Sequence, residues 1–147
     1  MSSEINKQLF RNLRELNLPL GEYAVFGSGP MGIRNLRDMH DIDLIVTQDL
    51  FDQFKNNPDW ETKDIYENND CFCGLINRKL DIEMFTKWYT EWNTRKLIKE
   101  AEMIDGLSFV KLEYVVQWKK QFASEKDLRD VELVKRFQAK QSDQGND

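Results

Sequence analysis

The sequence predicts a mixed α/β (α+β) fold, in which helices pack on a β-sheet. First, apolar residues recur at helical spacing near the N-terminus, at Ile5, Leu9 and Leu13. Second, short β-branched and aromatic runs bounded by Gly, Pro or Asn alternate with helical segments through the middle of the chain. Third, the last part of the chain returns to helical spacing. Interleaved strands and helices of this kind form one sheet covered by helices.

The N-terminal elements follow from local signals. Ser3 precedes a helix that reaches Leu16, where Pro19 and Gly21 end it. The β-rich run 23–26 stops at a glycine cluster, and a helical turn or two is expected from about 31 to 37. The run 42–46 is β-branched and apolar except for one aspartate, so a buried strand is expected there.

The middle and C-terminal elements follow in the same way. Thr47 and Asp49 can cap a helix that ends near residue 55. Asp105-Gly106 is the strongest short signal for a hairpin, and Ser124 can cap the last helix. The remaining expected elements are strands at 60–66, 72–76 and 80–85, a helix at 92–100, a hairpin at 103–110, a helix with Leu112, Val115, Val116, Lys119 and Phe122 on one face, and a frayed polar tail from Ala139.

Length and composition limit the classes of protein. The 147 residues fit one domain spanning 1–147, with its core at about 20–137 and a polar tail at 139–147. No apolar stretch is long enough to span a bilayer, and the N-terminus lacks the apolar segment of a signal peptide, so we expect a cytoplasmic location without membrane partners. The net charge of −5 makes long nucleic acid an unfavourable partner.

Two aspartates stand on one face of an apolar strand. Asp41 and Asp43 flank Ile42, and residues two apart on a strand point the same way. Like charges side by side repel and raise each other's pKa, and a divalent cation relieves this repulsion. Mg²⁺ binds carboxylate and phosphate oxygens, so the pair predicts a magnesium site. The alternative is a pair of solvated carboxylates in a loop before the strand.

A glycine turn lies about a dozen residues before the aspartates. Glycine at Gly27 lets the backbone approach a bulky ligand, and the hydroxyl of Ser28 can bond a phosphate. Amides of such a turn favour phosphate oxygens. Arg34 and Arg37 follow it; they form either an ordinary basic helix face or a surface that faces a triphosphate, and Arg34 is a candidate nucleotide-binding residue.

Gly27-Ser28, a short helix and Asp41-Ile42-Asp43 resemble the signature of the DNA polymerase beta-like nucleotidyltransferase superfamily. That signature is an apolar residue, Gly, then Gly or Ser, roughly a dozen residues, and acidic-apolar-acidic-apolar. The resemblance covers about residues 20–137. It implies a nucleotidyltransferase-type mixed sheet with C-terminal helices, Mg²⁺ as cofactor, and ATP or another NTP as substrate.

The resemblance also implies further site residues. The family places a third carboxylate on a later strand, where Asp81 is the first choice and Glu83, on the same strand face, the second. The C-terminal part resembles the closing helices of small bacterial minimal and aminoglycoside-type nucleotidyltransferases. In such proteins a lysine on the first of these helices lies near the nucleotide, which here implies Lys119 or Lys120, one pointing inward and one outward.

Two segments have alternative interpretations. Trp88, Tyr89 and Trp92 are either core aromatics or one wall of a pocket for an acceptor or a base. His40, where many family members have a small or hydroxyl residue, is interpreted as structural or solvated rather than catalytic. Pro30 alters the segment after Gly27-Ser28 by removing one amide donor.

These observations predict a nucleotidyltransferase that uses magnesium-bound aspartates to transfer a nucleoside monophosphate to an acceptor. Three kinds of acceptor are candidates: a small molecule (for example an aminoglycoside-like antibiotic), a protein, and the end of an RNA. The alternative is a nucleotide-binding or toxin–antitoxin-type partner module on the same fold, without turnover. Small size and the altered Gly-Ser segment favour that alternative.

Overall fold

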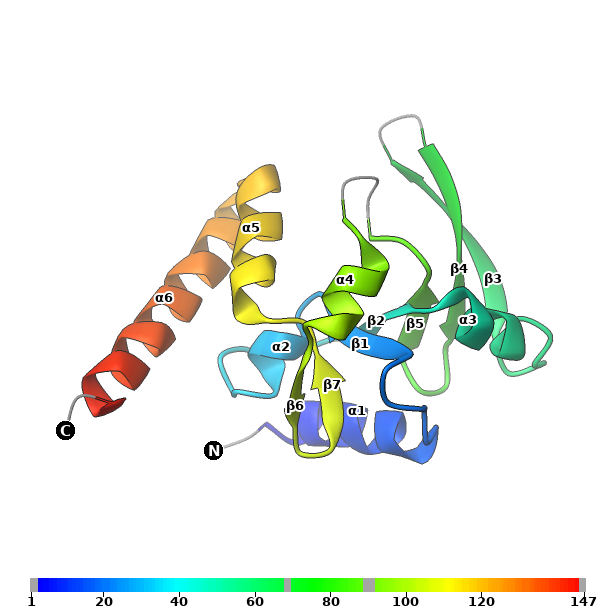
Figure 1. Ribbon diagram of the computed structural model, residues 1–147, viewed down its shortest axis with the longest axis horizontal. Coiled ribbons are helices and arrows are strands. Elements are labelled where there is room, and N and C mark those ends of the chain that lie inside the picture. Colours follow the sequence, from blue (N-terminus) through cyan, green and yellow to red (C-terminus); the bar gives the residue numbers. More distant parts are fainter. Residues whose placement is uncertain (1–2, 68–69, 89–91, 146–147) are drawn as a thin grey trace.

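A computed structural model of the chain describes residues 3–67, 70–88 and 92–145 and has a mixed α/β architecture (Figure 1). One seven-stranded sheet has the order β3-β4-β5-β2-β1-β7-β6. The strands are β1 Tyr23–Phe26, β2 Ile42–Val46, β3 Glu61–Glu67, β4 Asp70–Asn77, β5 Ile82–Phe85, β6 Glu102–Ile104 and β7 Leu107–Phe109. The helices are α1 Glu4–Glu15, α2 Gly29–Gly32, α3 Gln48–Phe54, α4 Thr94–Lys99, α5 Leu112–Phe122 and α6 Glu125–Gly145.

The centre of the sheet combines both kinds of strand pairing. β2 pairs antiparallel with β1 and parallel with β5. β7 pairs parallel with β1, and the hairpins β3–β4 and β6–β7 form the two edges. Because β1 runs against β2 and β5, the end of β1 and the beginnings of β2 and β5 meet at one end of the sheet.

Helices cover both faces of the sheet. Leu9 and Leu13 of α1 and Leu50 of α3 pack with Leu44 of β2 in one buried cluster. On the other face, Leu97 and Ile98 of α4 and Val115 of α5 pack with Ile45. The α5–α6 hairpin stands to one side of the sheet, with α6 as its outer helix (Figure 1).

Most expected elements are confirmed, several with their caps. Ser3 and Thr47 accept hydrogen bonds from Asn6 N and Leu50 N at the starts of α1 and α3. Ser124 accepts from Asp127 N, and Asp105 and Gly106 form the predicted turn with positive φ angles. These signals were readable from the sequence because each acts over only a few residues.

Two expectations about helices were wrong. The helix expected at 31–37 is only Gly29–Gly32, since Pro30 starts it early and Asn35 takes a left-handed φ of 61°. α6 continues through the tail that was expected to fray from Ala139. The helix predicted at the N-terminus is confirmed as α1, in which Ile5 is exposed and Asn6 lies on the buried face with Leu9 and Leu13.

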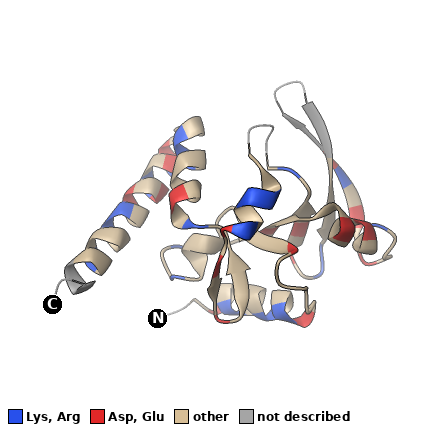
Figure 2. Cartoon of the chain, in the orientation of Figure 1, with Lys and Arg blue, Asp and Glu red and all other residues tan. Residues whose placement is uncertain are grey.

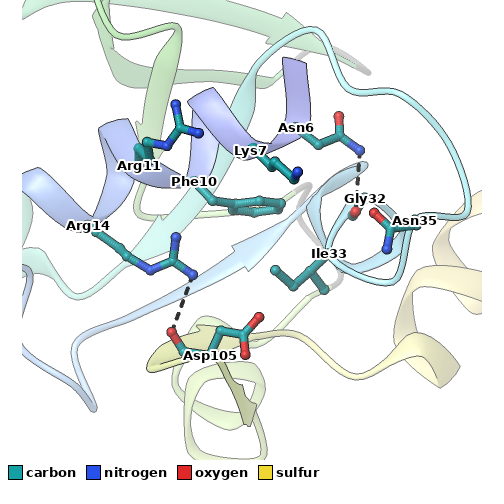
Figure 3. Close-up of a pocket in the computed structure, with 9 residues that line it drawn as sticks. All are labelled: Asn6, Lys7, Phe10, Arg11, Arg14, Gly32, Ile33, Asn35 and Asp105. Carbon is teal, nitrogen blue, oxygen red and sulfur yellow. Dashed lines mark hydrogen bonds between the residues drawn. The ribbon is translucent and has the colours of Figure 1, made fainter. Parts of the chain in front are cut away.

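Asn6 is a buried polar anchor between α1 and the segment that leads to the aspartates (Figure 3). Its amide nitrogen donates to the carbonyl oxygens of Gly32, at 3.3 Å, and Arg37, at 2.9 Å. Its amide oxygen accepts from Met39 N at 2.8 Å. A non-helical segment between α2 and β2 is therefore tied to α1 by one side chain.

Within the described residues, no helix is long and apolar enough to cross a bilayer.

Replacing Asn6 tests how much its hydrogen bonds contribute to the free energy of unfolding. Asn6→Ala removes three hydrogen bonds and leaves buried backbone groups unpaired, so we expect a loss of at least about 2 kcal/mol in the free energy of unfolding. Urea denaturation followed by fluorescence measures it. Gln8→Ala, on the exposed face of α1, is the control and should change stability by no more than about 0.5 kcal/mol. Equal stability of the two variants would contradict the anchoring role.

Candidate functional site

Asp43 occupies the middle of a row of side chains across the central strands. In register it is opposite Phe26 of β1 and Glu83 of β5. Alternation along β2 puts it on the same face as Ile45, the face covered by α4 and α5. Two carboxylates, Asp43 and Glu83, are therefore direct neighbours on adjacent strands.

Gly27 packs against the Asp43 carboxylate. A Cβ atom at Gly27 would lie 2.6 Å from Asp43 Oδ2, and the φ angle of Gly27 is +61°. Both the space and the backbone conformation exclude a larger residue at this position. Ser28 begins α2, but its side chain makes no capping hydrogen bond. The glycine turn and the carboxylate thus adjoin, as their spacing predicted.

Burial and neighbouring carboxylates raise the pKa values of both Asp43 and Asp41. The pKa of Asp43 is raised to about 8 by burial, and then by the charges of Asp41 and Glu83. The pKa of Asp41 is raised by burial and then by Glu83, while Lys63 opposes the rise. Asp41 is therefore close enough to disfavour the ionisation of Asp43, in agreement with their i, i+2 spacing.

Asp81 takes a different place from the one expected for it. β5 begins at Ile82, not at residue 80, and Asp81 has a left-handed φ of 57°. Asp81 therefore lies outside the strand, and the rule that places residues i and i+2 on one strand face does not apply to Asp81 and Glu83. Asp81 is exposed, its carbonyl oxygen accepts from Ile42 N at 2.9 Å, and its charge raises the pKa of Asp41. Glu83 is the carboxylate in register with Asp43.

Lys63 is a site residue that the sequence did not reveal. Its Nζ lies 2.9 Å from Glu83 Oε1. Lys63 comes from β3 and reaches β5 across β4, where Gly74 stands in register with it. Only the order of strands in the sheet brings Lys63 to the carboxylates, so no local pattern signals it.

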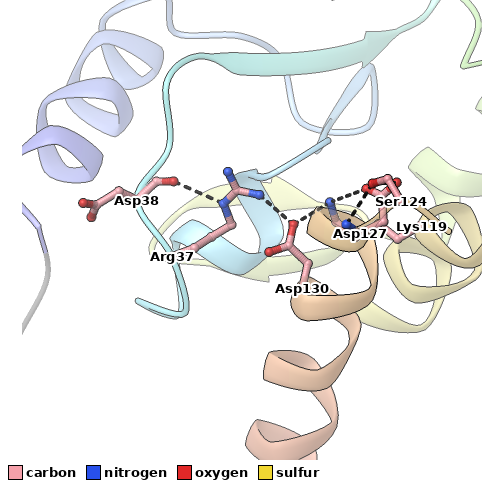
Figure 4. A network of polar contacts seen from close by, with 6 residues as sticks. All are labelled: Arg37, Asp38, Lys119, Ser124, Asp127 and Asp130. Atoms are coloured by element: carbon pink, nitrogen blue, oxygen red, sulfur yellow. Dashed lines mark hydrogen bonds and ion pairs between the residues drawn. The ribbon is translucent and has the colours of Figure 1, made fainter. Parts of the chain in front are cut away.

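Lys119 and Lys120 separate as predicted, one inward and one outward. Lys119 is 4% exposed, whereas Lys120 is exposed. Lys119 Nζ lies 2.9 Å from Asp130 Oδ2 and 3.7 Å from Asp127 Oδ1 (Figure 4). Arg37 Nη1 bonds the same Asp130 oxygen at 2.6 Å. The charge of Lys119 is thus already compensated within the α5–α6 hairpin.

Arg34 is likewise paired. Its guanidinium forms an ion pair with Glu102 of β6 and donates to Pro30 O at 2.7 Å. Of the cations expected to face a triphosphate, Lys120 alone is not engaged in an ion pair within the described residues.

The aromatic segment after β5 belongs to the core. Trp88 is 7% exposed and stacks on Phe26, with ring centroids 4.6 Å apart. Trp92 meets the edge of the same ring at 5.9 Å. Tyr89 lies outside the described residues. Phe26, the neighbour of Asp43 in the sheet, is therefore covered by aromatic side chains.

The donor chemistry of the carboxylate cluster fits a magnesium ion. Asp41, Asp43 and Glu83 offer only oxygen ligands, and burial together with the charges of Asp41 and Glu83 disfavours the ionised form of Asp43 when no cation is present. In 3–67, 70–88 and 92–145, however, no three His, Cys, Asp or Glu side chains are arranged to hold a metal ion. Glu83 is instead paired with Lys63.

Comparisons of the chain with protein-family models, with curated proteins and with solved structures found no match.

The Asp43 carboxyl should give stability a distinctive pH dependence when no divalent cation is present. An unfolded aspartate has a pKa of about 3.9, whereas folded Asp43 keeps its proton up to about pH 8. The folded state therefore binds the extra proton between these values, and stability falls as pH rises through this window, by up to about 1.4 kcal/mol per pH unit.

Asp43→Asn removes the titrating group and should flatten this profile. Urea denaturation in EDTA at about pH 5, 6.5 and 8 measures the slope for each protein. Asp38→Asn, at an exposed carboxylate, is the control and should keep the wild-type slope. An unchanged slope in Asp43→Asn would show that Asp43 is not the titrating group.

The buried ion-pair network should be costly to break. Asp130→Ala leaves Lys119 buried without its closest partner, so we expect a loss of about 3–5 kcal/mol in the free energy of unfolding. Glu132→Ala removes an exposed helix pair and should cost no more than about 0.5 kcal/mol. Chemical denaturation compares the two, and a loss below about 1 kcal/mol for Asp130→Ala would refute the network's role.

Proposed function

We propose that this protein is a magnesium-dependent nucleotidyltransferase. It transfers a nucleoside monophosphate from ATP or another NTP to a hydroxyl or phosphate of an acceptor and releases pyrophosphate. The observation that carries the proposal is the Asp43 carboxylate, set between the Gly27 turn and Glu83 with Asp41 beside it. Burying this charge is unfavourable without a cation, and a strand needs no such charge for stability.

In this proposal, three carboxylates bind the metal ion and a fourth accepts a proton. Asp41 and Asp43 hold the ion, and Glu83 takes the third position because it is in register with Asp43. A bound magnesium ion neutralises these carboxylates and stabilises negative charge on the phosphates. Asp81, exposed and beside Asp41, is suited to accept the proton of an acceptor hydroxyl. When no ion is bound, Lys63 compensates Glu83.

The triphosphate binds at the Gly27-Ser28 turn. Gly27 gives close access to the carboxylates, and the Ser28 hydroxyl is not used as a helix cap. Lys120 is the exposed cation that can add to phosphate binding. Arg34 and Lys119 act through their ion pairs, and we assign them a structural role. The proposal includes a cytoplasmic location and a small-molecule acceptor.

A second candidate is a nucleotide-binding or toxin–antitoxin-type partner module without turnover. One observation favours it: the side chains of Arg34 and Lys119, expected to neutralise charge developing on the phosphates, are engaged with Glu102 and Asp130. Such a module would bind the nucleotide at the turn without releasing pyrophosphate.

Calorimetric titration with ATP, with and without magnesium, tests the shared site. We expect magnesium-dependent binding that weakens by more than roughly 30-fold in Asp41→Asn/Asp43→Asn, since each change removes a partly buried charged ligand. Asp38 lies three residues before Asp41, and the control variant Asp38→Asn should bind ATP with magnesium like wild type. Absence of binding by the wild type to any NTP would exclude both candidates.

Two further measurements separate the remaining alternatives. Glu83→Gln should weaken magnesium-dependent binding, whereas Asp81→Asn should leave binding intact and lower turnover, because Asp81 serves the acceptor. The reverse result would assign the third metal position to Asp81. Pyrophosphate release during a screen of hydroxyl-bearing acceptors identifies the enzyme, and binding without release identifies the partner module.

A further inference from the structure

A separate cavity of about 780 Å³ lies at the opposite end of the sheet from the carboxylates. Val46, the last residue of β2, and Thr86, just after β5, line it. At about 3.3 Å per strand residue, β2 separates this cavity from Asp41 by roughly 15 Å. A group bound here does not reach the carboxylate cluster, so the cavity requires its own explanation.

One wall of this cavity is positively charged. Arg95 and Lys99 of α4 and Lys87 line it. Within the part of the chain that the structure describes, these three side chains take part in no ion pair. By contrast, Lys63 and Lys119 on other elements each have a carboxylate within 3 Å.

The charge of α4 is unfavourable for the isolated helix. Arg95 and Lys99 are four residues apart, and like charges at this spacing destabilise a helix. The helix Thr94–Lys99 contains no acidic residue that offsets them, and Figure 2 shows it in blue without red. An anion between these side chains would remove the repulsion.

The opposite wall carries two acids, each with a role of its own. Glu22 Oε1 accepts a hydrogen bond from Thr47 Oγ1 at 3.3 Å. Asp49 lies in the first turn of α3, where negative charge favours the helix. These acids repel a long polyanion that would fill the whole cavity, so they favour a small ligand whose anionic group faces α4.

A smaller cavity, beside α1, offers a contrast (Figure 3). It measures about 300 Å³ and is also lined by three cations. There Lys7 pairs with Glu4, Arg11 donates to Gln8, and Arg14 donates to the Asp105 carbonyl oxygen. Its cations already have partners, whereas those of the α4 cavity form no ion pair within the described ranges.

We infer that the cavity between α4 and the start of α3 binds a small organic anion, whose phosphate or carboxylate group is held by Arg95 and Lys99 with Lys87 beside them. The volume is within the range of small-molecule sites. This binding site is distinct from the carboxylate cluster and does not rest on the proposed transferase activity.

NMR titration of the whole chain with inorganic pyrophosphate and with citrate tests the site. The titrations are run in EDTA at constant ionic strength, so that magnesium-dependent binding at Asp41 and Asp43 does not contribute. We expect saturable amide shifts at residues 94–99 and 47–49 with at least one probe. A response to pyrophosphate alone indicates a phosphate group, a response to citrate alone a carboxylate group, and either supports the site.

Matched double variants make the test specific. Arg95→Ala/Lys99→Ala should weaken the affinity roughly tenfold or more, and alanine preserves helix propensity, so the backbone spectrum away from α4 should persist. Lys126→Ala/Arg129→Ala removes two exposed cations from α6 and should bind like wild type. Equal weakening in both variants, shifts confined to residues 27–28, or no saturable shift with either probe would overturn the inference. Loss of magnesium–ATP binding would not affect it.

Discussion

Keeping a carboxylate inside the central strand is the constraint on which the rest of this structure depends. Asp43 interrupts an otherwise apolar strand, and its neighbours are adjusted to it: Gly27 has no side chain where the carboxylate lies, and Glu83 stands beside it in register. Lys63 of β3 provides opposing charge from two strands beyond Glu83. Each adjustment is unfavourable or unnecessary for a sheet alone, which is why the cluster is interpreted as a binding site for a cation and phosphate.

The segment between α2 and β2, which delivers Asp41 to the site, is held from two sides. Asn6 of α1 binds its backbone at Gly32, Arg37 and Met39. The Arg37 side chain binds Asp130, which also pairs with the buried Lys119 (Figure 4). Irregular backbone needs such fixed partners, because it has no ladder or helix of its own to satisfy its polar groups. The N-terminal helix and the C-terminal hairpin therefore both support the position of the aspartates.

The two ends of the sheet have opposite electrostatic character. Carboxylates gather where β1 ends and β2 and β5 begin, whereas the cations Arg95 and Lys99, which form no ion pair with any described residue, lie beyond the other end of β2. The net charge of −5 hides this separation, since it averages over the whole surface. We therefore propose a cation with its phosphate ligand at one end and an anion at the other, two sites of opposite charge preference on one sheet.

By itself the sequence determined the mixed α/β class, the central strands, the caps and the proximity of the glycine turn to the aspartates, because periodicity, capping and i, i+2 alternation act over short distances. Only the tertiary structure decided the contacts between residues that are far apart in the sequence. The strand order places Lys63 beside Glu83, and the pairing of β2 with β5 places Glu83, not Asp81, opposite Asp43. The packing of α5 on α6 buries Lys119 against Asp130. These contacts join residues far apart in the chain, for which no local pattern carries a signal.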